Sequence, residues 1–508
     1  MSIINASVEQ TDNYKVQANK MSTEVELQAV PSDTSQEERT FDQVEIEPTE
    51  ENVTVEGADN PAYTDTETTE QTESDFTIPP MTFVDFMPRL IEEAASNVDS
   101  PIYSEFSSVM EQVNQWLKGN PDYQAMKLES FTKKLSEKEN APDLEQVMYH
   151  ESSYGINKYV RGLRLWLAPR LDTSSPIQEI GYITTMPEPS EGEASDPDSM
   201  LSLFKVGMFN ARAVMPTYCG YKEMMDKLNK FLKKKPLPGS VLSIENVKVK
   251  YDENSLGKCM DSESMSWADC GKDDRIYMFA IRIYYIIGKP TFEVVSYHDE
   301  APVCQNNWET MSKLRYCPFT TVVQRGRAWL RNQKGIRVVN MQTVDVFCDR
   351  TSKGEARVHH DKTGYVEAAG KDAQFARVLR IFYIVDPKSS VCPYETVNLT
   401  SRLFIPTRRG DWGKNCETFS KTMQRVIKWL QLTKVPIFGV ETVIHPFTPD
   451  SYGTGVRDDS STVSLIAAQG KYFITTVRLY FPCEFEEPDP KLLPQPEEEE
   501  GWWACTVS

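Results

Sequence analysis

Residues 419–430 read FSKTMQRVIKWL, and three further stretches of the chain follow the same plan. Their first, fourth, fifth, eighth, eleventh and twelfth positions are mostly apolar, which is the spacing of one face of an α-helix. The other three are FSSVMEQVNQWL at 106–117, YKEMMDKLNKFL at 221–232 and FTTVVQRGRAWL at 319–330. The pattern predicts four similar helices, and it places large aromatic residues at one shared position, namely Trp116, Phe231, Trp329 and Trp429.

Two more signatures follow each predicted helix in constant order. The first begins with an acid or its amide and continues with a small polar residue, at Glu129-Ser130, Glu245-Asn246, Gln342-Thr343 and Glu441-Thr442. The second is an arginine between apolar residues, 48–51 residues after the helix aromatic, at Arg164, Arg282, Arg380 and Arg478. Three signatures at near-constant spacing indicate an array of four repeats.

Each repeat is predicted to be an α-β-β-β unit of the α+β class, with one helix packed on a small antiparallel sheet. The first strand carries the acid signature, and the closing strand is dense in β-branched and aromatic residues. A short second strand is predicted between them, near residues 147–149, 265–267, 365–367 and 463–466. Strand-like runs in the linkers, at 180–185, 291–297 and 403–406, are expected to add edge strands or to join neighbouring repeats.

The charge of the chain is concentrated in its two ends. The formal net charge is −20, but residues 1–75 hold nineteen acids against three basic residues, and residues 484–500 hold eight acids against one lysine. The middle of the chain is therefore nearly neutral, which argues against nucleic acid as the main partner. We predict a disordered acidic tail at 1–80, repeat 1 at 81–170, linker and repeat 2 at 171–290, linker and repeat 3 at 291–386, linker and repeat 4 at 387–483, and an acidic flexible tail at 484–508.

The four arginines have a structural and a functional interpretation. Alternation along the closing strand places Leu379 and Ile381 on one face, and Arg380 on the other. The structural interpretation is an ion pair with the acid of the first strand, with Gln342 as a neutral substitute. The functional interpretation is a repeated anion site. Four copies at one internal position favour the structural interpretation.

No linear catalytic or metal-binding motif occurs in the chain. Its five histidines form no H-E-x-x-H, and there is no C-x-x-C pair, no nucleophile elbow and no phosphate-binding loop. We therefore predict no catalytic, cofactor-binding or metal-binding residues. An enzyme whose site lies at a repeat interface is retained as an alternative, because such a site needs no linear motif.

The two ends carry short motifs. The last four residues, Cys505-Thr-Val-Ser, fit a prenylation box whose final serine favours farnesyl. Trp502 and Trp503 could add affinity for a membrane interface, whereas Glu497–Glu500 would be repelled by anionic lipid, so reversible membrane association is expected rather than stable anchoring. Asn60-Pro61-Ala62-Tyr63 resembles the motif read by phosphotyrosine-binding-type and endocytic adaptor domains.

The cysteine content fits a cytoplasmic protein, since the ten cysteines are not accompanied by a segment that looks like a signal peptide. The leading hypothesis is a non-enzymatic, repeat-based interaction scaffold that binds protein partners through its variable loops 259–270, 349–370 and 448–461, with reversible membrane association through Cys505. The alternative is an extracellular ligand-binding or matrix-type protein, with oxidised cysteines and a glycosylated Asn398. The sequence specifies neither the partner nor the oligomeric state.

Overall fold

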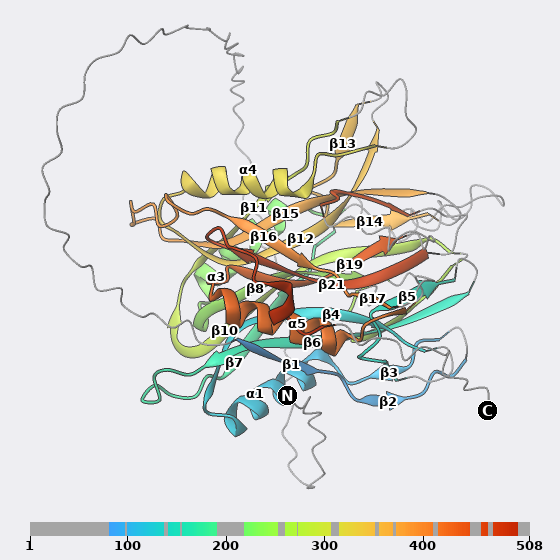
Figure 1. Cartoon of the computed structure of the whole chain (residues 1–508), viewed down its shortest axis with the longest axis horizontal. Coiled ribbons are helices and arrows are strands. Elements are labelled where there is room, and N and C mark those ends of the chain that lie inside the picture. Colours follow the sequence, from blue (N-terminus) through green and yellow to red (C-terminus); the bar gives the residue numbers. More distant parts are fainter. Residues whose placement is uncertain are drawn as a thin grey trace, which may run out of the picture. The chain divides into compact units, whose positions relative to one another are not determined.

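The computed structural model describes residues 81–495, apart from 97–98, 137–140, 153–154, 190–217, 252–259, 272, 306–313, 351–354, 369–371, 410–414, 448–458 and 466–470. The four predicted helices are present as α1 (Phe106–Gly119), α3 (Tyr221–Lys234), α4 (Phe319–Arg331) and α5 (Phe419–Thr433). Each buries the predicted apolar stripe, except for its eleventh position in α1, α3 and α4. Small antiparallel sheets accompany them, and together they form a propeller-like arrangement of four blades (Figure 1).

Each blade is a split β-α-β unit. In the third repeat the edge strand β11 (Val294–Glu300) leads into α4, and α4 leads into the first strand β12 (Ile336–Arg350). The closing strand β15 (Ala373–Val385) lies between β11 and β12 and is antiparallel to both. The other blades place their edge, first and closing strands in the same way: β1 (Thr82–Phe86), β4 (Tyr123–Lys134) and β6 (Ile156–Pro169); β7 (Ile180–Thr185), β8 (Leu237–Lys250) and β10 (Arg275–Thr291); β16 (Thr400–Phe404), β19 (Gly439–Phe447) and β21 (Lys471–Phe481). The linkers therefore supply edge strands, as predicted.

The predicted short second strand exists in every repeat, but it joins the sheet of a neighbour. β9 (Ser266–Cys270) of repeat 2 pairs with β6, β14 (Gly364–Glu367) of repeat 3 pairs with β10, and β20 (Thr462–Leu465) of repeat 4 pairs with β15. β5 (Met148–Glu151) of repeat 1 pairs with β21 of repeat 4. The prediction of four self-contained α-β-β-β units is wrong in this respect.

The reason for the exchange lies in strand lengths. In repeat 1 the edge strand β1 pairs only with Leu163–Leu167 of β6, so the first half of β6 is left without a neighbour on that side. β9 of repeat 2 fills this place by pairing with Ile156–Val160. The second strand of each repeat thus pairs with the sheet of the preceding repeat. Because the second strand of repeat 1 pairs with the sheet of repeat 4, the four repeats form a closed ring. Short additional strands lie outside this plan: β2 (Leu90–Glu92), β3 (Ile102–Tyr103), β13 (Ala356–Val358), β17 (Arg408–Arg409) and β18 (Asn415–Cys416).

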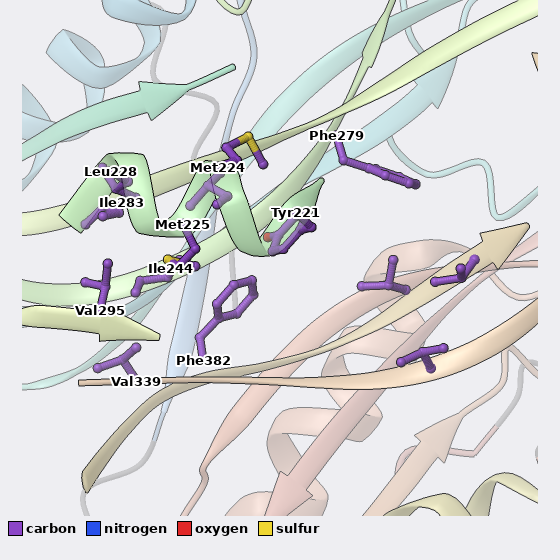
Figure 2. Close-up of a cluster of buried hydrophobic side chains, with 14 of the residues drawn as sticks. Tyr221, Met224, Met225, Leu228, Ile244, Phe279, Ile283, Val295, Val339 and Phe382 are labelled. Atoms are coloured by element: carbon purple, nitrogen blue, oxygen red, sulfur yellow. The ribbon is translucent and has the colours of Figure 1, made fainter. Parts of the chain in front are cut away.

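The two faces of each sheet contact two different repeats. Leu379 and Ile381 pack against α4 of their own repeat, as the alternation predicts. Phe382, on the opposite face, packs against α3 of the preceding repeat. Figure 2 shows Phe382 close to Tyr221 and Met225 of α3. The same relation places Tyr284, Tyr480 and Trp166 in the cores built around α1, α4 and α5.

The aromatic residues near the helix ends differ more than the shared pattern predicts. Trp429 is fully buried, and it contacts Phe404, Phe481 and Phe485. Trp116 and Trp329 are half-buried, and Phe231 is 50% exposed. This position lies at the margin of the apolar stripe, so its burial depends on what other segments provide, such as Phe404 and Phe485 beside Trp429.

For the positions that follow, the end of the ring where the first strands finish (Lys134, Lys250, Arg350 and Phe447) is called the loop end. The opposite end, where the closing strands finish (Pro169, Thr291, Val385 and Phe481), is called the linker end.

Candidate functional site

The acid signature of the first strands forms a ring of contacts between repeats. The Glu245 carboxylate accepts hydrogen bonds from the backbone N–H of Ser130 at 2.8 Å and from its hydroxyl at 2.7 Å. Glu129 accepts from the N–H of Thr442 at 2.6 Å, which joins repeat 1 to repeat 4. Glu441 accepts in the same way from Thr343. Within the described residues, the edge of each first strand that faces away from its closing strand has no strand neighbour at this point. The acid of the next repeat therefore satisfies a backbone donor that would otherwise lack a partner.

The single amide in this ring is matched by its surroundings. The side chain of Gln342 accepts from the N–H of Asn246 at 2.8 Å and donates to the Asn246 carbonyl at 3.1 Å. In the other repeats the residue two positions after the arginine donates a hydrogen bond to the acid: Trp166 to Glu129, Tyr284 to Glu245 and Tyr480 to Glu441. Repeat 3 has Phe382 at this place, and its side chain has no hydrogen-bond donor. The repeat that lacks this donor is therefore also the repeat that has a neutral amide in place of the acid.

The recurring arginines are buried, and each stacks on the helix of the preceding repeat. The guanidinium carbons of Arg282, Arg380 and Arg478 lie 3.6, 3.7 and 4.0 Å from the ring centres of Phe106, Tyr221 and Phe319. Arg164 lies 4.6 Å from Phe419 of repeat 4. These contacts at the first residue of each helix give the arginines a role in joining repeats.

The ion pairs of the arginines differ from the predicted ones. Arg164 lies 3.4 Å from Glu129 and Arg282 lies 4.0 Å from Glu245, so these two do face the acid of their first strand. The shorter pairs, however, are with the edge strand: Arg164 with Asp85 at 2.7 Å, and Arg380 with Asp299 at 2.6 Å. Sequence alternation located the face but could not identify the edge-strand partner.

A fourth recurring residue was missed by the sequence analysis. An acid lies nineteen residues before each closing arginine, at Glu145, Glu263, Asp361 and Asp459. Each caps the helix of the preceding repeat: its carbonyl accepts from the first helical N–H, and its carboxylate accepts from the second. A carboxylate at a helix N-terminus also interacts favourably with the helix dipole. The constant spacing was the signal that could have revealed it.

A buried charged cluster crosses the ring at the loop end. Glu151, in the sheet of repeat 4, pairs with Arg275 of repeat 2 at 2.9 Å and accepts a hydrogen bond from Tyr159. Asp269 pairs with Lys250 at 2.8 Å and accepts from Tyr277. Burial raises the pKa of both tyrosines well above the usual value, which keeps them protonated as donors. Each acid in this cluster thus has a matched donor, and the arrangement joins opposite blades.

The linker end also has a contact across the ring. The ammonium group of Lys127 in repeat 1 donates to the carbonyl of Val339 in repeat 3. Burial, together with repulsion from Arg337, lowers the pKa of Lys127 to about 7. Repeats 1 and 3 are opposite in the ring, so this lysine ties them together near the axis.

The remaining predicted site residues lie outside the described part of the chain. These are Cys505 with its prenylation box, and Asn60, Pro61 and Tyr63 of the adaptor-type motif. Of the predicted contact loops, 259–270 is described from residue 260 on, 349–370 is described apart from 351–354 and 369–370, and 448–461 is described only from residue 459 on. Their described parts carry the helix caps Glu263, Asp361 and Asp459. The segments 252–259, 351–354 and 448–458, which follow the first strands of repeats 2, 3 and 4, lie outside the described residues.

The described residues contain no group of three or more histidine, cysteine, aspartate or glutamate side chains arranged to hold a metal ion. Among the described residues the free thiols include Cys219, Cys270, Cys317, Cys348, Cys392 and Cys483. No helix among the described residues is long and apolar enough to cross a membrane.

Comparisons with known proteins give no assignment. No family model, no curated protein and no solved structure matches this chain significantly.

Proposed function

We propose that this chain is a non-enzymatic interaction scaffold, whose ring of blades presents variable loops to protein partners. The observation that carries the proposal is that the recurring residues hold the repeats together, whereas the loops between the strands vary. The recurring polar side chains join one repeat to the next, through the acid ring, the stacked arginines and the helix caps. The loops that leave the first strands at the loop end differ in length and sequence. A rigid frame with varied loops is the usual design of repeat-based binding proteins.

The charged groups of the frame support a structural role over a catalytic one. Glu151 and Asp269, the two acids of the cluster across the loop end, each have a basic partner and a tyrosine donor. A general acid or base needs a free proton site facing a substrate, and a matched pair of this kind lacks one. The enzyme alternative would be supported only by a reaction that stops when Glu151 is changed to Gln in a folded variant.

Loop replacement tests the scaffold proposal. The segments 252–259, 351–354 and 448–458, which follow the first strands of repeats 2, 3 and 4, are each replaced by glycine and serine at equal length, and the helix caps are kept. We expect an unchanged melting temperature and the loss of a distinct set of cross-linked partners from each variant, measured by quantitative cross-linking of the native protein. If none of the three replacements changed the set of cross-linked partners, the result would contradict the proposal.

Reversible membrane association through farnesylated Cys505 belongs to the same proposal. The intact mass of the native protein should show a farnesyl addition that Cys505→Ser lacks, and the variant should leave the membrane fraction. A cytoplasmic location is supported by the surroundings of Asn398, the glycosylation candidate of the extracellular alternative. Its side chain is bound to Glu484 at 2.6 Å and accepts a hydrogen bond from Arg327, so a glycan there would have to displace both contacts.

A further inference from the structure

The second blade extends beyond the other three at the linker end. Its closing strand β10 continues nine residues past Arg282, to Thr291, whereas β6, β15 and β21 end five, five and three residues past their arginines. Thr291 pairs with Leu237, which begins β8 shortly after the end of α3. The end of α3 and the end of β10 are therefore neighbours, and α3, β7 and β10 lie together on one side of Figure 1.

This extension carries lysines and large apolar side chains, and it is called the lysine–phenylalanine surface. Its members are Lys230, Phe231, Lys233, Lys234 and Lys235 at the end of α3, and Ile287, Lys289 and Phe292 at the end of β10 and just after it. All eight are exposed, with Phe231, Ile287 and Phe292 at 50%, 44% and 45%. The corresponding helix aromatic is at least half-buried in the other three repeats.

The lysines of this surface are not neutralised by acids within the described residues. No ion pair there involves any of the five. Between residues 227 and 250 the only acid is the buried Glu245, and Glu293, next to Phe292, is paired with Arg337 at 2.6 Å. The first half of α3 differs, because Lys222 pairs with Asp226 at 3.6 Å and Lys227 pairs with Glu188 at 2.7 Å. The chain as a whole is acidic, so this concentration of positive charge is a local property of the second blade.

We propose that the lysine–phenylalanine surface binds the headgroup face of an anionic phospholipid membrane. The ammonium groups would contact lipid phosphates and carboxylates, and Phe231, Ile287 and Phe292 would enter the boundary with the acyl chains. Lysine is depleted in protein–protein interfaces, so an acidic protein partner accounts less well for five lysines around three exposed apolar residues. The surface belongs to the fold and acts without Cys505. In the lipidated protein it would add a second membrane contact to the single prenyl group.

Vesicle binding by the full chain tests this proposal. Cys505→Ser protein, which cannot be prenylated, is sedimented with vesicles of phosphatidylcholine alone or of phosphatidylcholine with phosphatidylserine. We expect binding only where phosphatidylserine is present, and weaker binding as salt is added. Lys233→Gln/Lys234→Gln/Lys235→Gln should reduce the partition coefficient on the order of 100-fold. Phe231→Ser/Phe292→Ser should reduce the binding that remains at high salt.

Matched controls separate the surface from the overall charge. Lys222→Gln/Lys334→Gln/Lys388→Gln removes the same charge at other exposed positions, and Ile102→Ser/Val303→Ser removes exposed apolar side chains elsewhere. Both controls should bind as the parent protein does, with all variants checked by thermal melting. Equal losses in the two triple lysine variants, or no binding of the parent to phosphatidylserine, would overturn the proposal. Binding to polyglutamate without binding to vesicles would overturn it in favour of an acidic protein partner. Because lipidation is absent throughout, these outcomes do not depend on the farnesyl prediction.

Discussion

The most specific residue-level feature is the match between Gln342, Asn246 and Phe382. Gln342→Glu would set a carboxylate against the Asn246 carbonyl, in a place where Phe382 offers no donor. We expect a loss of about 2 kcal/mol in the free energy of unfolding, measured with urea. Adding Asn246→Ser and Phe382→Tyr recreates the arrangement of repeat 2 and should restore most of the loss. A triple variant that is less stable than Gln342→Glu alone would show that the match is not the cause.

Lys127 gives a second residue-level prediction, concerning pH. Its pKa falls from 10.5 to about 7 on folding, so between these values the unfolded chain binds more protons. The contribution of Lys127 to stability therefore rises with pH from 7 towards 10.5 and is constant below 7. Relative to Lys127→Met, the wild type should gain about 2 kcal/mol between pH 6.5 and pH 9.5, allowing for partial solvent screening. Urea unfolding at both pH values measures this, and Lys334→Met, at an exposed site, should show no such change.

At the scale of the elements, the helix caps come from another repeat. The Asp459 carboxylate accepts from the Thr320 N–H at 2.6 Å and from its hydroxyl at 3.1 Å. Asp459→Asn keeps an acceptor but removes the charge at the helix N-terminus, and we expect a loss of about 1 kcal/mol. Thermal unfolding at low salt measures it, with the exposed Glu395→Gln as control. No loss, or a loss that salt does not reduce, would speak against a charge–dipole contribution.

Helical and strand periodicity predicted most of these elements, because it depends only on local sequence. The apolar stripe of α4 and the alternation around Arg380 are of this kind. The destination of β9 was not predictable in the same way, since a five-residue strand has two pairing edges and no preference for either neighbour. The cap Asp361 could have been found from its spacing to Arg380. The contact from Lys127 to Val339 could not, because it exists only once the ring has closed.

At the scale of the whole molecule, closure makes the junction between repeats 4 and 1 equivalent to the others. β5 pairs with β21, Glu145 caps α5, Glu129 accepts from Thr442, and Arg164 stacks on Phe419. The three junctions along the chain have the same kinds of contact. A linear array would leave its two terminal repeats with uncovered faces and would require special capping repeats. The closed ring needs none, because each repeat covers the next.

Circular permutation tests this equivalence. Met81, Phe485 and Leu493 all pack against the same core around α5, so the two ends of the described chain can be joined by a short glycine–serine linker. New ends are opened in the exposed loop between Thr173 and Ser174. If the junctions are equivalent, repeats 1 and 2 will join without a covalent link, and the permutant should unfold in one cooperative urea transition, as is also expected of the parent. A truncated chain of residues 81–386 is the control: it lacks β21, the partner of β5, and should not form a stable ring. Two separate transitions in the permutant would mean that the covalent link between repeats, rather than closure of the ring, holds the first blade in place.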